Sequence, residues 1–103
     1  MFLHIGGDVV VSLKSIISIL DFASVIKSKD TRLFLQTAEE EGFIRRINDQ
    51  EPKSLIITEK VQGKKKGSKK AVQTVIYYSP ISSVTLQKRA NFLKESQIQN
   101  FLK

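Results

Sequence analysis

Two long runs of strand-forming residues limit the fold of this 103-residue chain more than any other feature of its sequence. Residues 55–61 begin with Leu-Ile-Ile-Thr, and residues 71–78 read Ala-Val-Gln-Thr-Val-Ile-Tyr-Tyr, so both runs are rich in β-branched or aromatic side chains. Residues 63–70, which separate them, are only glycine, serine and lysine. We therefore predict an antiparallel hairpin of two strands, with residues 62–70 at its tip.

Shorter strand signals occupy the first half of the chain. Residues 2–5 and 9–11 flank Gly-Gly-Asp, a turn sequence, and this arrangement indicates a second hairpin. Residues 16–20 carry β-branched side chains on both alternating faces, which is typical of a strand covered on both sides. Residues 43–47 indicate another strand, and residues 48–52 (Asn-Asp-Gln-Glu-Pro) indicate a loop.

Two helices are expected as well. Asp30 is a good N-cap residue and Gly42 is a good residue to follow a helix end, so we predict a helix between them. Its spacing places Leu33, Phe34 and Ala38 on the buried face. A second helix is predicted after Ser79-Pro80, where apolar residues recur near helical spacing at Val84, Leu86, Ala90, Leu93 and Ile98.

Three glutamates crowd the C-terminal end of the first predicted helix. Glu39, Glu40 and Glu41 stand where the helix dipole favours cations instead. One interpretation is that a cation within the fold or on another subunit pairs with them. The other interpretation is that the three carboxylates are simply hydrated.

The composition and the order of these elements fit one α+β domain over residues 1–103, with a mostly antiparallel sheet and two helices. Hydrophobic residues make up 41% of the chain and charged residues 26%, as in ordinary globular proteins rather than disordered ones. A chain of this length buries enough surface for one domain and little else.

Few residues are available that could perform chemistry. The chain has no cysteine, which excludes disulfides and thiolate catalysis, and His4 is its only histidine. We expect His4 to be a hydrogen-bonded structural residue, and metal binding becomes relevant only if copies of it meet in an oligomer. The sequence contains no G-x-S-x-G, H-E-x-x-H, phosphate-loop or calcium-loop motif. We therefore expect a protein that is not an enzyme and that needs no cofactor or metal.

No targeting or membrane-spanning segment is recognisable near the start of the chain. The first residues lack a basic n-region, and Asp8 and Lys14 interrupt the apolar stretch. The apolar run at residues 16–20 stops at Asp21, well short of the roughly 20 residues that a membrane helix needs. We expect a cytoplasmic protein that does not bind a membrane.

Positive charge is concentrated in one segment. Lysine and arginine number 17 against 10 aspartates and glutamates, which gives a formal charge of +7. Six lysines and no acidic residue fall within residues 60–70, so the rest of the chain holds eleven basic residues against ten acidic ones. Such a cluster attracts polyanions such as nucleic acid, and without an aromatic residue it would contact the phosphate backbone rather than the bases. The alternative is a hydrated hairpin end that only prevents edge-to-edge pairing of strands.

Several stretches of the chain resemble one protein family. His-Ile-Gly-Gly-Asp-Val-Val-Val-Ser (residues 4–12) and Ile-Ile-Ser-Ile-Leu-Asp-Phe (residues 16–22) resemble the amino-terminal signature of the RemA/RemB family of bacterial extracellular-matrix regulators. Three more stretches resemble its RemB branch, namely Pro-Lys-Ser-Leu-Ile-Ile-Thr (residues 52–58), Ile-Tyr-Tyr-Ser-Pro-Ile-Ser-Ser (residues 76–83) and Thr-Leu-Gln-Lys-Arg-Ala (residues 85–90). The resemblance covers most of the chain outside residues 59–73.

This resemblance implies a fold related to the LytTR DNA-binding domain, assembly into a closed ring, and DNA held against the basic rim of that ring. It also implies a transcriptional role in biofilm matrix genes of Firmicutes. RemA members carry a pair of arginines in the loop before the central strand, whereas the corresponding loop here is acidic and keeps only Lys53. A ring suits the physics, because many copies of one weak basic patch bind together by avidity.

Our leading hypothesis is therefore a DNA-binding regulator of the RemB type that acts as a homo-oligomer. The expected phosphate contacts are the lysines of the hairpin tip, which would replace the missing arginine pair: Lys64, Lys65, Lys66, Lys69 and Lys70. Arg45, Arg46 and Lys53 are expected as secondary contacts, and Lys88 and Arg89 as lesser ones. The rival hypothesis is an oligomeric protein–protein scaffold that has lost DNA binding together with the arginine pair.

Overall fold

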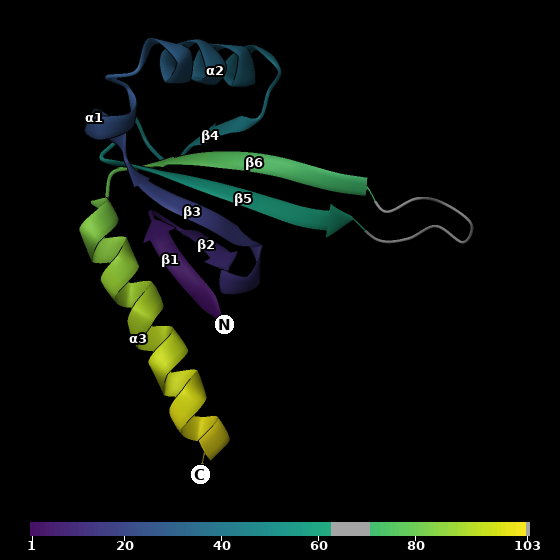
Figure 1. Cartoon of the computed structure of the whole chain (residues 1–103), viewed down its shortest axis with the longest axis vertical. Coiled ribbons are helices and arrows are strands. Elements are labelled where there is room, and N and C mark those ends of the chain that lie inside the picture. The colour runs from purple at the N-terminus through teal and green to yellow at the C-terminus, as the bar shows by residue number, and fades with distance from the viewer. Residues whose placement is uncertain (63–70, 103) are drawn as a thin grey trace.

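The centre of the protein is a four-stranded sheet with the strand order β3-β5-β6-β4 (Figure 1). Its middle strands, β5 (Ser54–Gln62) and β6 (Ala71–Ser79), pair antiparallel along their whole length. The computed structural model describes residues 1–62 and 71–102. The two strands of the predicted hairpin are therefore confirmed, whereas its tip lies outside the described residues.

Shorter strands complete the sheets. β3 (Ile16–Asp21) joins β5 antiparallel and β4 (Ile44–Arg46) joins β6 in parallel, so the sheet is mostly antiparallel, as predicted. β1 (Phe2–Gly6) and β2 (Val9–Ser12) form the second predicted hairpin, as a separate two-stranded sheet. The two glycines at its turn have φ angles of 126° and 52°, which residues with a side chain rarely adopt. This backbone conformation accounts for the Gly-Gly sequence at the turn.

Both faces of the four-stranded sheet are covered (Figure 1). The β1–β2 hairpin and the long helix α3 (Ser83–Leu102) cover one face, here called the α3 face. The helices α1 (Phe22–Val25) and α2 (Lys29–Glu40) cover the other, the α2 face. Successive strand residues point to opposite faces, so adjacent residues of β5 enter different cores. The buried residues are Leu3, Ile5, Val11, Ile56, Leu86 and Ala90 in the core of the α3 face, and Leu35, Ala38, Leu55, Ile76 and Tyr78 in the core of the α2 face.

A buried hydrogen bond fastens the β1–β2 hairpin to the central sheet. The Oγ of Ser79, at the end of β6, donates to the carbonyl oxygen of Ile5 at 2.6 Å and accepts from the backbone N of Ile81 at 3.0 Å. Ser54, which pairs with Ser79 across the strands, is equally buried. Its Oγ has no hydrogen-bond partner among the described residues. The end of β6 thus positions both β1 and the segment that leads into α3.

The helix predicted between Asp30 and Gly42 is present, but its N-cap differs from the prediction. Ser28 is the N-cap, because its Oγ accepts from the backbone N of Thr31 at 3.3 Å. Asp30 lies in the first turn instead. Gly42 follows the helix with a φ of 79°, as expected for the residue after a helix end.

The buried face of α2 also differs from the prediction. Leu33 and Phe34 are 51% and 57% exposed, whereas Leu35 and Ala38 are buried. Residues three apart lie on one side of a helix just as residues four apart do. The apolar residues of this helix therefore define overlapping faces, and the spacing alone cannot identify the face that meets the sheet.

Three further features depart from the sequence-based expectations. The four-residue helix α1 brings the number of α-helices in the described chain to three, and a 3₁₀ turn is present at Leu13–Ser15. Asp21 caps α1 by accepting from the backbone N of Ser24 at 3.0 Å and from its Oγ at 2.6 Å. Ile17 of β3 is 57% exposed rather than covered, and the pairing register of β3 shifts between Ile16 and Ser18.

Candidate nucleic-acid interface

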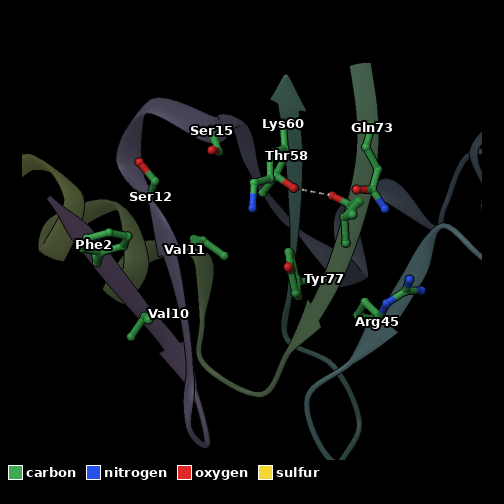
Figure 2. A pocket seen from close by; sticks show the side chains of 11 residues that line it. Phe2, Val10, Val11, Ser12, Ser15, Arg45, Thr58, Lys60, Gln73 and Tyr77 are labelled. Carbon is green, nitrogen blue, oxygen red and sulfur yellow. Dashed lines mark hydrogen bonds between the residues drawn. The ribbon is translucent and has the colours of Figure 1, made fainter. Parts of the chain in front are cut away.

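Arg45 and Arg46 are neighbours on β4. Because successive side chains of a strand point to opposite faces, these two lie on opposite faces of the sheet. Arg45 lies on the α3 face, where it lines a cleft together with Tyr77 (Figure 2). Its Nη1 donates to the carbonyl oxygens of Gly42 at 2.7 Å and Ile44 at 3.2 Å, which holds the guanidinium beside the strand. The side chain is exposed and forms no ion pair with a described residue, so its charge is available to an anion.

Arg46 is engaged within the fold, on the α2 face. Its Nη2 lies 3.3 Å from Oε1 of Glu39, and its guanidinium carbon lies 5.1 Å from the ring centroid of Tyr78. Burial raises the pKa of the Tyr78 hydroxyl above its ordinary value of 10.0, Glu39 raises it further, and Arg46 acts in the opposite direction. One of the three crowded glutamates therefore has a cation within the fold. Glu40 and Glu41 form no ion pair with a described residue.

Lys53 lies at the opposite end of β5 from the lysine-rich segment. Its backbone N donates to the carbonyl oxygen of Ser79 at 2.8 Å, and its own carbonyl oxygen accepts from the backbone N of Phe22 at 3.1 Å. These bonds fix the backbone here while the Lys53 side chain remains exposed. The nine residues of β5 span roughly 25–30 Å, which separates Lys53 from the end of the strand at Gln62.

The described structure does not bring the expected DNA contacts into one group. Arg45 and Arg46 lie opposite Tyr77 and Tyr78, toward the end of β6 that is far from Ala71. The main expected contacts lie outside the described residues: Lys64, Lys65, Lys66, Lys69 and Lys70. The lesser expected contacts, Lys88 and Arg89, are exposed on α3.

The cleft beside Arg45 contains residues that the sequence analysis does not assign to a site (Figure 2). Lys60 reaches it from β5, and Phe2 and Ser12 reach it from the β1–β2 hairpin. Lys60 belongs to the acid-free stretch of lysines, which was a signal that could have identified it. Phe2 and Ser12 carried no such signal, because only the packing of the hairpin on the sheet brings them to the cleft that Arg45 lines.

An apolar surface is exposed on the α3 face. Phe2 of β1 and Phe92 of α3 are both 67% exposed, and they border a hollow together with Leu93. Lys88 and Arg89 line the same hollow, so this surface, the α3 apolar surface, has a cationic edge.

A second apolar surface is exposed on the α2 face. Phe34 and Phe43 border a hollow with Val72 of β6, and all three side chains are exposed. The unpaired Glu40 and Glu41 lie at the end of the same helix as Phe34. Neither glutamate lines the hollow itself, which is here called the α2 apolar surface.

His4 has a structural hydrogen bond, as expected, because its Nε2 donates to the carbonyl oxygen of Gly7 at 2.6 Å. Across residues 1–62 and 71–102, histidine, aspartate and glutamate do not gather in a group of three that could hold a metal ion. In the same part of the chain, no helix combines the length and apolar character needed to cross a membrane.

Residues 2–90 match the family described as RemA-like, extracellular matrix regulatory protein A-like. The chain belongs to this family. It is also 37% identical over 95 residues to extracellular matrix regulatory protein B of Bacillus subtilis (strain 168), a match that covers 92% of this chain and 96% of that protein. The resemblance to the RemA/RemB family and to its RemB branch is thus confirmed.

The match to the RemA-like family includes every described cation that the sequence analysis assigns to DNA contact. It ends at residue 90, so the second half of α3 lies beyond it. The α+β class is confirmed by the fold, whereas a specific likeness to the LytTR domain stays a prediction.

Proposed function

We propose that this RemA-like protein is a non-enzymatic regulator that binds DNA as a homo-oligomer. Its relative is named extracellular matrix regulatory protein B, which supports a regulatory role of the RemB type rather than catalysis. The observation that most supports DNA binding is the concentration of positive charge, because six lysines within residues 60–70 account for nearly all of the net charge of +7. Five of them are the proposed phosphate contacts: Lys64, Lys65, Lys66, Lys69 and Lys70. A cytoplasmic location follows from this proposal, since a DNA-binding regulator must reach the chromosome.

The described cations would contribute unequally. Arg45 is exposed and unpaired among the described residues, so it is the best placed of them to contact a phosphate. Lys53 is exposed on a loop whose backbone is fixed at both sides, and it would add a second contact. Arg46 would contribute least, because Glu39 neutralises part of its charge.

The two apolar surfaces support assembly into a ring. Monomeric proteins rarely expose large apolar patches, and here exposed phenylalanines occur on both sides of the sheet. Lys88 and Arg89 line the α3 apolar surface, and Glu40 and Glu41 lie at the C-terminal end of the helix that borders the α2 apolar surface, so the two regions carry opposite charges. When two different surfaces of one chain meet, the subunits join head to tail and close into a ring if the rotation permits.

Charge substitutions in the two surfaces test this assembly. Phe92→Asp and Phe34→Asp should each reduce the mass measured by multi-angle light scattering to that of a single chain, because each places a charge in an apolar contact. Val84→Asp is the matched control, since Val84 is also exposed on α3 but lies outside both hollows. A wild-type protein that is monomeric at high concentration would contradict the oligomer.

Binding to labelled duplex DNA, measured by fluorescence anisotropy at several salt concentrations, tests the DNA-binding part. About four phosphate contacts give a slope of log K against log salt near −3.6. Replacing Lys64, Lys65, Lys66 and Lys69 with glutamine should weaken binding equally for all sequences and flatten this slope. The matched control removes four exposed lysines elsewhere, namely Lys14, Lys27, Lys29 and Lys94, and should have a smaller effect. The proposal fails if wild-type protein does not bind DNA even at low salt.

A second candidate function is an oligomeric scaffold that does not bind DNA. The acidic loop at residues 48–53 and the ion pair between Arg46 and Glu39 favour it, because both reduce the positive potential near β4. This candidate predicts a stable oligomer that DNA does not retain at moderate salt. The anisotropy and light-scattering measurements together distinguish the two functions.

A further inference from the structure

A cleft of about 510 Å³ lies between the β1–β2 hairpin and the strands β4, β5 and β6. In Figure 2, Phe2 lies on its hairpin side and Arg45 on its far side, with Lys60 and Tyr77 on the strands between them. Pockets that hold small ligands have volumes of about 300–1,000 Å³. The size of this cleft therefore suits a small molecule.

The charges that line the cleft are all positive. Arg45 and Lys60 line it, and none of its described lining residues is an aspartate or glutamate. The described bonds of Arg45 use only Nη1, and a guanidinium has about five N–H donors, so donors remain for a ligand. Lys60 forms no ion pair with a described residue. Two cations without an acid match the charge of a phosphomonoester dianion.

Hydroxyl groups and aromatic rings supply the other contacts. Ser12 and Ser15 line the cleft near the end of β2, where their hydroxyls can donate to phosphate oxygens. Phe2 offers an exposed ring from the hairpin, and Tyr77 offers a half-buried ring from the sheet. Planar rings stack on such side chains, so the cleft combines an anion site with an aromatic site.

We propose that this cleft binds a small ligand that joins a phosphate dianion to a planar ring, which is the chemistry of a nucleoside monophosphate. The phosphate contacts Arg45 and Lys60, and the ring contacts Phe2 or Tyr77. The ring contact distinguishes this ligand from a DNA duplex, whose bases stay stacked inside the helix and do not reach Phe2 or Tyr77. The inference thus goes beyond the proposed function and does not depend on DNA binding.

Titration of the full-length, ¹⁵N-labelled protein with adenosine monophosphate tests the inference by NMR. Saturable shifts are expected at the backbone amides of cleft residues such as Val11, Ser12, Thr58 and Lys60. Arg45→Met and Lys60→Met should each weaken binding at least tenfold, because each removes one of the two charges opposite the phosphate. Lys94→Met is the control, since Lys94 is an exposed cation outside this cleft, and it should leave the affinity unchanged.

Adenosine and inorganic phosphate identify which half of the ligand is recognised. Each is expected to bind at least tenfold more weakly than adenosine monophosphate, because each lacks one of the two contacts. Equal binding of either compound would overturn the proposal, and so would shifts confined to residues 63–70. A DNA duplex that shifts the same cleft amides and displaces adenosine monophosphate would assign the cleft to nucleic acid instead.

Discussion

The two faces of the central sheet are held to their covering elements by different polar contacts. On the α3 face, the Oγ of Ser79 is fully buried and donates to the carbonyl oxygen of Ile5 at 2.6 Å. On the α2 face, Arg46 and Glu39 form an ion pair at 3.3 Å whose side chains are both 54% exposed. Water competes for the second contact but not for the first. We therefore expect the neutral hydrogen bond to contribute more to stability than the pair of full charges.

The largest expected effect comes from the buried contact. Ser79→Ala leaves the carbonyl oxygen of Ile5 without its buried donor, so the free energy of unfolding should fall by about 1–3 kcal/mol. Urea denaturation followed by circular dichroism measures this change.

Ser54→Ala is the matched control for this prediction, because Ser54 is equally buried but its Oγ has no partner among the described residues. Removing an unpaired hydroxyl should change the free energy of unfolding by less than about 0.5 kcal/mol, or should increase it. Equal losses in Ser79→Ala and Ser54→Ala would show that the bond to Ile5 does not fasten the hairpin.

A smaller effect is expected from the exposed ion pair. A double-mutant cycle with Glu39→Gln and Arg46→Met should give a coupling energy of about 0.2–1 kcal/mol, since water screens both charges. Arg45→Met is the neighbouring control and should leave stability nearly unchanged, because Arg45 forms no ion pair with a described residue and its two hydrogen bonds to backbone carbonyl oxygens are exposed to water. Urea denaturation at low and high salt measures the coupling, which should decrease with salt. A coupling energy as large as the effect of Ser79→Ala would show that the exposed ion pair contributes as much to stability as the buried hydrogen bond.

The smallest effect is a pH dependence on the α2 face. Burial raises the pKa of Tyr78 above its ordinary value of 10.0, so in alkali the unfolded chain loses this proton before the folded protein does. The stability that this shift contributes is fully present below about pH 10 and is lost as the pH rises through the folded pKa. The unfolding free energy of wild type relative to that of Tyr78→Phe should therefore fall between about pH 8 and about pH 11. A difference that stays constant over this interval would show that Tyr78 ionises equally in both states.

Local sequence patterns predicted most of the elements of the fold. The strands at 55–61 and 71–78 were identified from runs of β-branched and aromatic residues, and they pair as β5 and β6. The hairpin around Gly-Gly-Asp was identified from two short strand-forming runs and from the turn sequence between them. The two glycines of that turn have the positive φ angles that residues with a side chain rarely adopt. The short helix α1 was missed, since four residues are too few to show a helical period.

The candidate site was predicted less completely. The sequence identified Arg45, but it gave no reason to connect Arg45 with Phe2, which comes from the other side of the cleft. The sequence also offered no reason to distinguish Arg45 from Arg46. In the folded sheet, Arg45 lines a cleft, whereas Arg46 forms an ion pair with Glu39.

Three properties of this protein can be read from local stretches of its sequence: the concentration of positive charge at residues 60–70, the strands on either side of it and the family to which the chain belongs. Two other properties depend on the folded structure. One is the buried face of α2, which does not include Phe34, and the other is the ion pairing of Arg46 but not of Arg45 with a described residue. The physical reason is that propensity and charge depend on residues close in the chain. Burial and ion pairing depend instead on contacts between segments that only the folded packing brings together.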